Sequence, residues 1–189
     1  ELSEADVHVP VYVGMRNWHP LLPDTFAQMS RNGARRVLAF VCAAYRSYSS
    51  CTQYRQNVAD ARKAIMAAGL PDVDVVYVGD WHTHEGFIAA NAEHVEAALQ
   101  SLDPGVRDRA RLVFTAHSIP TSMPGVERYE SQLRESAALV AAQVNREDWA
   151  LVFQSRSGRP EDPWLEPDVC QYLRTERAAG LAAAVICPI

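Results

Sequence analysis

The histidine at position 117 ends a short apolar run and is the strongest candidate for chemistry in this chain. Residues 112–116 read Leu-Val-Phe-Thr-Ala, which is typical of a buried strand, and Pro120 prevents a helix from following at once. In open α/β sheets ligands bind beyond the carboxyl ends of parallel strands, so we expect His117 where such proteins do their chemistry. An imidazole, with an ordinary pKa of about 6.5, can accept a proton or ligate a metal ion near neutral pH. A single strand-end histidine can also simply hydrogen-bond a loop.

Aromatic, imidazole and guanidinium side chains follow the other predicted strands. If the strands are parallel, these side chains gather at one rim, and rings together with arginines suit a flat aromatic ligand that carries carboxylates. Each also has a structural interpretation, because a tryptophan can fill the edge of a core and an arginine can be a solvated charge. The spacing of an aspartate and two histidines in one of these loops resembles a metal site only weakly. The side chains concerned are Arg16, Trp18, Arg46, Asp80, Trp81, His82 and His84.

Strand and helix patterns alternate along the whole chain. Apolar residues recur at helical spacing from Tyr54 to Ala68, from Ile88 to Leu102 and from Leu133 to Val144. The alternation predicts an α/β fold with a mostly parallel, doubly wound sheet. We expect a domain boundary at the turn Asp103-Pro104-Gly105, giving domains at residues 1–105 and 106–189. Near-continuous apolar runs are typical of parallel strands covered on both faces, and they predict such strands at Val9–Val13, Arg36–Cys42, Val73–Val78, Arg111–Phe114, Ala150–Phe153 and Leu181–Cys187.

The composition argues against several classes of protein. A chain of 189 residues, 48% hydrophobic and 22% charged, suits one large or two small soluble domains. Its formal net charge of −5, without a basic cluster, gives no case for nucleic acid as a partner. The apolar runs are too short to span a bilayer and the acidic start has no signal-peptide pattern, so we expect a cytoplasmic protein. Neither a dinucleotide glycine motif, a P-loop nor a nucleophile elbow is present.

The patterns at both ends of the chain lead us to expect that it is a segment of a longer enzyme. A strand is expected almost at once, and the last predicted strand ends at Ile189 without a helix to cover it. The four cysteines form no C-x-x-C pair, which is weak evidence for zinc and none for a disulfide framework. They are Cys42, Cys51, Cys170 and Cys187.

Three motifs, in order, resemble the ferrochelatase family over nearly the whole chain. Phe114–Pro120 is similar to that family's active-site histidine segment, and Val11–Arg16 to a characteristic strand end. Gln154–Arg156, followed by Trp164–Pro167, resembles its second signature. The arginine- and alanine-rich composition and residues 47–54 are most similar to the actinobacterial branch, whose members insert iron into coproporphyrin III to give coproheme.

This resemblance implies two similar doubly wound, Rossmann-like domains with the porphyrin in a cleft between them. It implies ferrous iron and a porphyrin as substrates in haem biosynthesis, without an organic cofactor, and a monomer. It assigns His117 as metal ligand, proton acceptor or both. It also assigns porphyrin contacts to Tyr54, Arg16, Ser118 and Gln154, although Tyr54 also suits the buried face of its helix.

The family pairs its histidine with a glutamate a few residues past the segment that ends at Ile189, so we expect these 189 residues alone to be inactive. Some actinobacterial members hold a [2Fe–2S] cluster with several cysteine ligands beyond the segment that ends at Ile189, and Cys51 or Cys170 could contribute a further one.

Two other functions stay open at this point. A cobalt chelatase acting on sirohydrochlorin shares the fold and uses more than one histidine, so an essential His82 or His84 would favour it. A porphyrin- or haem-binding module without turnover would use the same residues for binding only.

Overall fold

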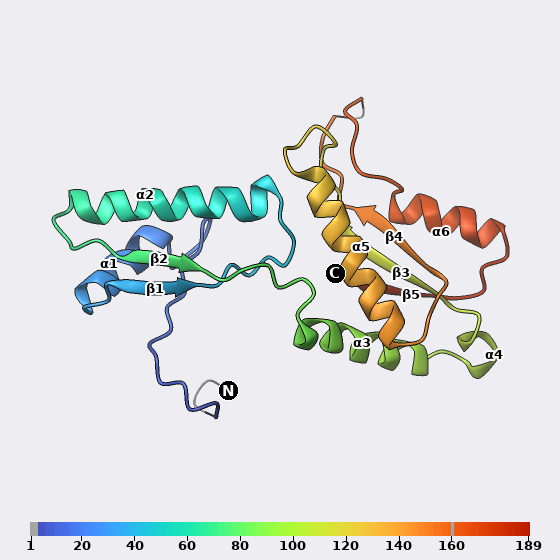
Figure 1. The fold of residues 1–189 in the computed structure, drawn as a ribbon. Coiled ribbons are helices and arrows are strands. Elements are labelled where there is room, and N and C mark those ends of the chain that lie inside the picture. The colour runs from blue at the N-terminus through green and yellow to red at the C-terminus, as the bar shows by residue number, and fades with distance from the viewer. Residues whose placement is uncertain (1–3, 160) are drawn as a thin grey trace. The chain divides into compact units, whose positions relative to one another are not determined.

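The computed structural model describes residues 4–159 and 161–189, which form two compact units (Figure 1). One unit comprises the chain up to Cys42 and Ser49–Gly79, and the other comprises Ala43–Tyr48 and Asp80–Ile189. Each contains a parallel sheet and helices, which confirms the predicted α/β class. Among the described residues, no helix is both long and apolar enough to cross a membrane.

The first unit pairs two short parallel strands, β1 (Arg36–Ala39) and β2 (Asp74–Tyr77), with two helices. The helices are α1 (Leu22–Arg31) and α2 (Gln53–Ala67), and a π-helical turn at Tyr48–Thr52 precedes α2. Apolar side chains at helical spacing on both helices bury themselves against each other and against the start of β2. This core consists of Leu22, Phe26, Met29, Val58, Ala61, Ile65 and Val73.

Two expectations for this unit are wrong. The β1–β2 strands alternate between packed and exposed positions and are not covered on both faces, since Leu38 is 71% exposed. The predicted strand at Val9–Val13 does not form: these residues lie outside every described strand, and Val9, Val11 and Val13 are exposed. An extended apolar segment becomes a strand only when another strand accepts its backbone hydrogen bonds, and this segment has no such partner among the described residues.

The second unit is built on three parallel strands in the order β4-β3-β5. They are β3 (Arg111–His117), β4 (Trp149–Gln154) and β5 (Ala184–Pro188), close to the predicted runs. The helices are α3 (Glu85–Gln100), the short α4 (Pro104–Arg107), α5 (Val126–Gln143) and α6 (Val169–Ala178). Helices α3 and α5 pack against each other and share one core with the sheet, whereas α6 packs against β4 outside that core (Figure 1).

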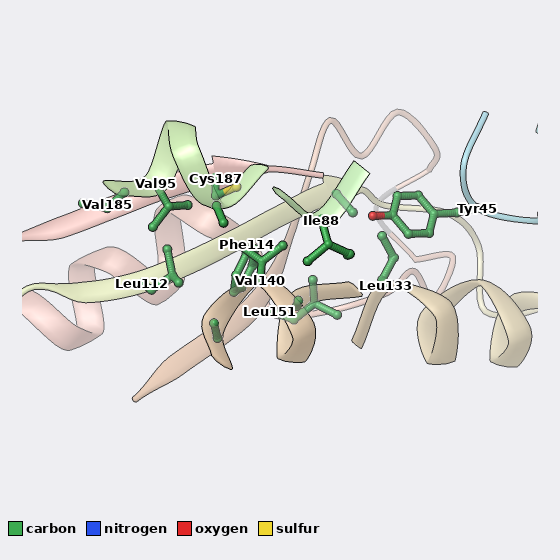
Figure 2. Close-up of a cluster of buried hydrophobic side chains, with 14 of the residues drawn as sticks. Tyr45, Ile88, Val95, Leu112, Phe114, Leu133, Val140, Leu151, Val185 and Cys187 are labelled. Atoms are coloured by element: carbon green, nitrogen blue, oxygen red, sulfur yellow. The ribbon is translucent and has the colours of Figure 1, made fainter. Parts of the chain in front are cut away.

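Alternate residues of β3 form the centre of this core. Leu112 and Phe114 point toward α3 and α5, where Leu133 and Val140 meet them (Figure 2). The Phe114 ring packs edge-to-face on Trp149, with 5.7 Å between ring centroids. Strand β3 is central in the sheet and buried on both faces, so the backbone of the residue at its end is held by the sheet.

The division between the units differs from the boundary expected near residue 105. Helix α3 packs on α5 and β5 and therefore belongs to the second unit. The segment Ala43–Tyr48 also belongs there, because the Tyr45 ring lies in the second core beside Ile88 and Leu133 (Figure 2).

Candidate active site

His117 is the last residue of β3 and the first exposed one. The five residues before it are buried, and its register partner on β4 is Gln154. Strand β3 is parallel to both of its neighbours, so the histidine lies at the carboxyl edge of the sheet, as the sequence predicts. The imidazole is therefore held on a rigid strand and is open to a ligand.

Ser118 and Gln154 lie next to this histidine, and their backbones are joined. The Ser118 N–H donates to the Gln154 carbonyl at 2.7 Å, and the buried Ser118 hydroxyl donates to the Leu165 carbonyl at 2.8 Å. The Leu165 N–H donates in turn to the Ile119 carbonyl at 3.0 Å. The Ser118 side chain thus ties the loop after β3 to the second signature motif, and porphyrin contact by either residue stays a prediction.

The second signature motif folds directly onto the loop that follows His117. Trp164 forms a bridge with Pro120, and a Cβ on Gly158 would lie 2.4 Å from the indole, so only glycine fits beneath that ring. Ser155 turns the chain at the end of β4 with a left-handed φ of 61°. Two of the three motifs that carry the family resemblance are therefore parts of one packed loop pair.

Arg16 and Tyr54 come together in the first unit. The Arg16 guanidinium donates to Gln53 at 2.8 Å and to Asn57 at 2.9 Å, both on α2, and its carbon lies 5.0 Å from the centre of the Tyr54 ring. Tyr54 is half-buried, so part of its ring stays accessible. The structure thus gathers the predicted residues into two groups, one in each unit, and porphyrin contact by Arg16 and Tyr54 stays a prediction.

A polar cluster that sequence reasoning missed centres on Asp80. Its carboxylate accepts hydrogen bonds from Arg46, from Arg128 at 2.7 Å and from Gln132 at 3.2 Å. The Gln132 side-chain oxygen accepts the Arg46 backbone N–H at 2.8 Å. Burial by itself would raise the pKa of Asp80, but the hydrogen bonds from Arg46 and Arg128 outweigh it and hold that pKa below its ordinary value. The sequence places Arg46 and Asp80 at one rim, and the i, i+4 spacing of Arg128 and Gln132 on one helix was the only signal for the other two members.

Removing the Asp80 charge is expected to destabilise the second unit. We expect Asp80→Asn to lower the free energy of unfolding at pH 7 by about 1–3 kcal/mol, because two arginines lose a partly buried partner. A lowered pKa means that this contribution is complete above the ordinary aspartate pKa of about 3.9 and is lost as the pH falls through the lowered value. The difference in free energy of unfolding between the wild-type protein and Asp80→Asn should therefore become smaller below about pH 4.

Urea unfolding at several pH values measures this effect. The control is Asp74→Asn, which removes an aspartate whose pairing with Arg36 at 3.7 Å is well exposed. The prediction would be contradicted if both substitutions lowered the free energy of unfolding equally. It would also be contradicted if the loss caused by Asp80→Asn became larger at acid pH.

The metal-like spacing of Asp80, His82 and His84 does not make a metal site. His82 is buried, and its Nε2 lies 2.9 Å from a Glu135 carboxylate oxygen. His84 caps α3 by accepting the Gly86 N–H at 3.1 Å. Asp80 and His82 both lie beside the Gln132 amide, whereas His84 is used in the helix cap. No group of metal ligands forms among the described residues, so the weak metal interpretation is wrong.

The cysteines likewise do not fit an iron–sulfur cluster. Cys42 and Cys170 are exposed, Cys51 is half-buried, and burial raises the pKa of the Cys187 thiol to about 11. Across residues 4–159 and 161–189, no three histidine, cysteine, aspartate or glutamate side chains gather as metal ligands. The described residues therefore do not supply the thiolate set that a [2Fe–2S] cluster needs.

The two tryptophans of the predicted rim behave differently. Trp81 packs edge-to-face on Phe87 at 5.1 Å between ring centroids, so it fills the edge of a core. Trp18 is 74% exposed and does not fill the edge of a core.

Comparison with known proteins decides the family. The ferrochelatase family model matches residues 1–189. The chain belongs to the ferrochelatase family. This confirms the resemblance that the three sequence motifs carry.

The chain resembles curated members of this family over part of their length. Coproporphyrin III ferrochelatases of Nocardia farcinica and Streptomyces coelicolor are 41% and 40% identical to it; each match covers all of this chain and 55% and 54% of the respective relative. A ferrochelatase of Rhodopirellula baltica is 45% identical over 97% of this chain and 51% of that protein. The chain therefore spans about half the length of the curated relatives it matches.

Proposed function

We propose that the protein inserts ferrous iron into a porphyrin and that His117 carries the metal step. The observation that supports this most is an exposed imidazole at the end of a strand buried on both faces, with the second family signature folded against the following loop. Such a side chain is accessible to a ligand, and the backbone that carries it is held by the sheet.

Insertion exchanges two porphyrin protons for one ferrous ion. Each Fe²⁺ that enters displaces the protons of two pyrrole N–H groups, so the net charge of the macrocycle and its metal is conserved. A neutral imidazole has one free nitrogen lone pair, which can bind the incoming iron or accept a pyrrole proton. Because His117 is exposed, a proton taken up there can pass to solvent before the next transfer.

For the porphyrin we propose coproporphyrin III. Two of the relatives named above carry that activity in their names, and Arg16 and Tyr54 present a guanidinium and a half-buried ring in one place. An arginine can bind a propionate carboxylate and a tyrosine ring can contact the macrocycle face. Like the location in the cytoplasm and the monomeric state, this substrate stays a prediction.

The substrate proposal is tested by comparing two porphyrins. For the complete polypeptide that contains this sequence, kcat/KM should be at least about tenfold higher with coproporphyrin III than with protoporphyrin IX, because two additional propionates are available for recognition. Initial rates of anaerobic Fe²⁺ insertion, followed by absorbance, provide the comparison. Equal values or a reversed preference would overturn the substrate assignment and leave iron insertion itself standing.

A cobalt chelatase acting on sirohydrochlorin is not favoured. That alternative needs His82 or His84 at the metal, yet His82 is buried against Glu135 and His84 caps a helix. A binding module without turnover differs from the proposed enzyme only in the insertion reaction, which the assay above measures directly.

A further inference from the structure

We propose that Tyr129 is a positioning residue for His117, and this inference rests on the function proposed above. The Tyr129 hydroxyl donates a hydrogen bond to the His117 backbone carbonyl at 3.0 Å. Tyr129 lies twelve positions along the chain, in the first turn of α5, so the contact joins the catalytic strand to the helix that packs on it.

The peptide group between His117 and Ser118 is held at both ends. Tyr129 binds its carbonyl oxygen, and its N–H donates to the Gln154 carbonyl at 2.7 Å. A peptide group is planar, so two hydrogen bonds on opposite sides fix its rotation. That rotation sets the backbone from which the His117 imidazole projects.

Tyr129 is itself immobile enough for this task. The residue is buried, its N–H donates to the Gly125 carbonyl at 3.0 Å, and burial raises the pKa of its hydroxyl to about 12. The hydroxyl therefore stays protonated, and a donor, over the whole neutral range. The ring packs edge-to-face on Tyr45, with 6.3 Å between ring centroids and 89° between planes.

The same turn of α5 is anchored by the Asp80 cluster. Arg128, next to Tyr129, donates to Asp80 at 2.7 Å, and Gln132 bridges Asp80 and the Arg46 backbone. The hydrogen bond to His117 therefore comes from a helix turn held by charged and polar contacts to two loops of the same unit. A loop residue without such support would impose less order on its acceptor.

The test compares Tyr129→Phe with Tyr45→Phe. Both substitutions remove one hydroxyl from the same packed pair of buried tyrosines, but only the Tyr129 hydroxyl donates to the His117 carbonyl. In the complete polypeptide we expect Tyr129→Phe to lower kcat for Fe²⁺ insertion roughly tenfold with the porphyrin KM nearly unchanged, because misplacement affects the reacting geometry more than binding. Tyr45→Phe should keep kcat within about twofold of wild type.

A second readout does not depend on activity. The ¹H–¹³C signals of the His117 ring, assigned by their loss in His117→Ala, should shift or broaden in Tyr129→Phe and stay in place in Tyr45→Phe. If the wild-type protein inserts no iron, the proposed function fails, and these signals still decide whether Tyr129 positions His117.

The proposal is overturned if Tyr129→Phe matches wild type in the His117 signals. It is equally overturned if the two substitutions change these signals and kcat by the same amount, since the hydroxyl would then act only through general packing.

Discussion

Replacing His117 by alanine is expected to lower kcat for iron insertion by about 10²- to 10⁴-fold while the porphyrin still binds. The imidazole is exposed at the end of β3, so its removal leaves the core of the second unit intact. The loss should fall on kcat because the group acts on the metal and on the pyrrole protons during reaction. Steady-state insertion rates and porphyrin fluorescence titrations of the complete polypeptide measure the two quantities separately.

A second histidine provides the control for this experiment. His84→Ala removes an exposed imidazole that caps α3, which costs about 1 kcal/mol of stability and should leave kcat nearly unchanged. Normal turnover by His117→Ala would remove the histidine from the mechanism. If His84→Ala lost turnover and His117→Ala kept it, the cobalt chelatase alternative would be favoured.

The second large effect is expected in the core beneath the site. Leu133→Ala should lower the free energy of unfolding of the second unit by about 3–4 kcal/mol, because it leaves a cavity in a fully buried position against β3. Leu139→Ala provides the matched control on the same helix, where the side chain is 41% exposed, and should change stability by about 0.5 kcal/mol or less. Urea unfolding followed by tryptophan fluorescence gives both values.

Similar losses of unfolding free energy in Leu133→Ala and Leu139→Ala would contradict the assignment of Leu133 to the core. The comparison also bears on the site, because α5 carries Tyr129 as well as Leu133. A protein weakened by Leu133→Ala should lose insertion activity at lower urea concentrations than wild type does.

The strands and the position of His117 were predictable because their signals are local. The runs at 112–114 and 151–153 are apolar because they are buried on both faces, and burial of that kind shows in consecutive residues. A histidine and Pro120 directly after such a run mark the strand end. Local signals do not predict whether a segment has a neighbouring strand to pair with. The apolar residues at Val9–Val13 have no such strand among the described residues, and no strand forms there.

The contacts around the site were not predictable, because they join residues far apart in the sequence. Asp80 is bound by Arg128 and Gln132, and His82 by Glu135, all of them on α5. Nothing in the spacing of Asp80 and His82 indicates these partners, so the sequence alone did not exclude a metal site at these residues. The contact between Tyr129 and the His117 carbonyl is of the same kind, since a tyrosine in a helical stripe gives no sign of its acceptor.

The most direct test of the account is a single-turnover reaction. The complete polypeptide, loaded with one equivalent of coproporphyrin III, is mixed anaerobically with excess Fe²⁺, and the absorbance of metal-free and iron porphyrin is followed. We expect the wild-type protein to convert the bound porphyrin to the iron porphyrin, and His117→Ala, with the porphyrin bound, to form none on the same timescale. Porphyrin that stays bound but metal-free in the wild-type protein would show a binding module and contradict the account.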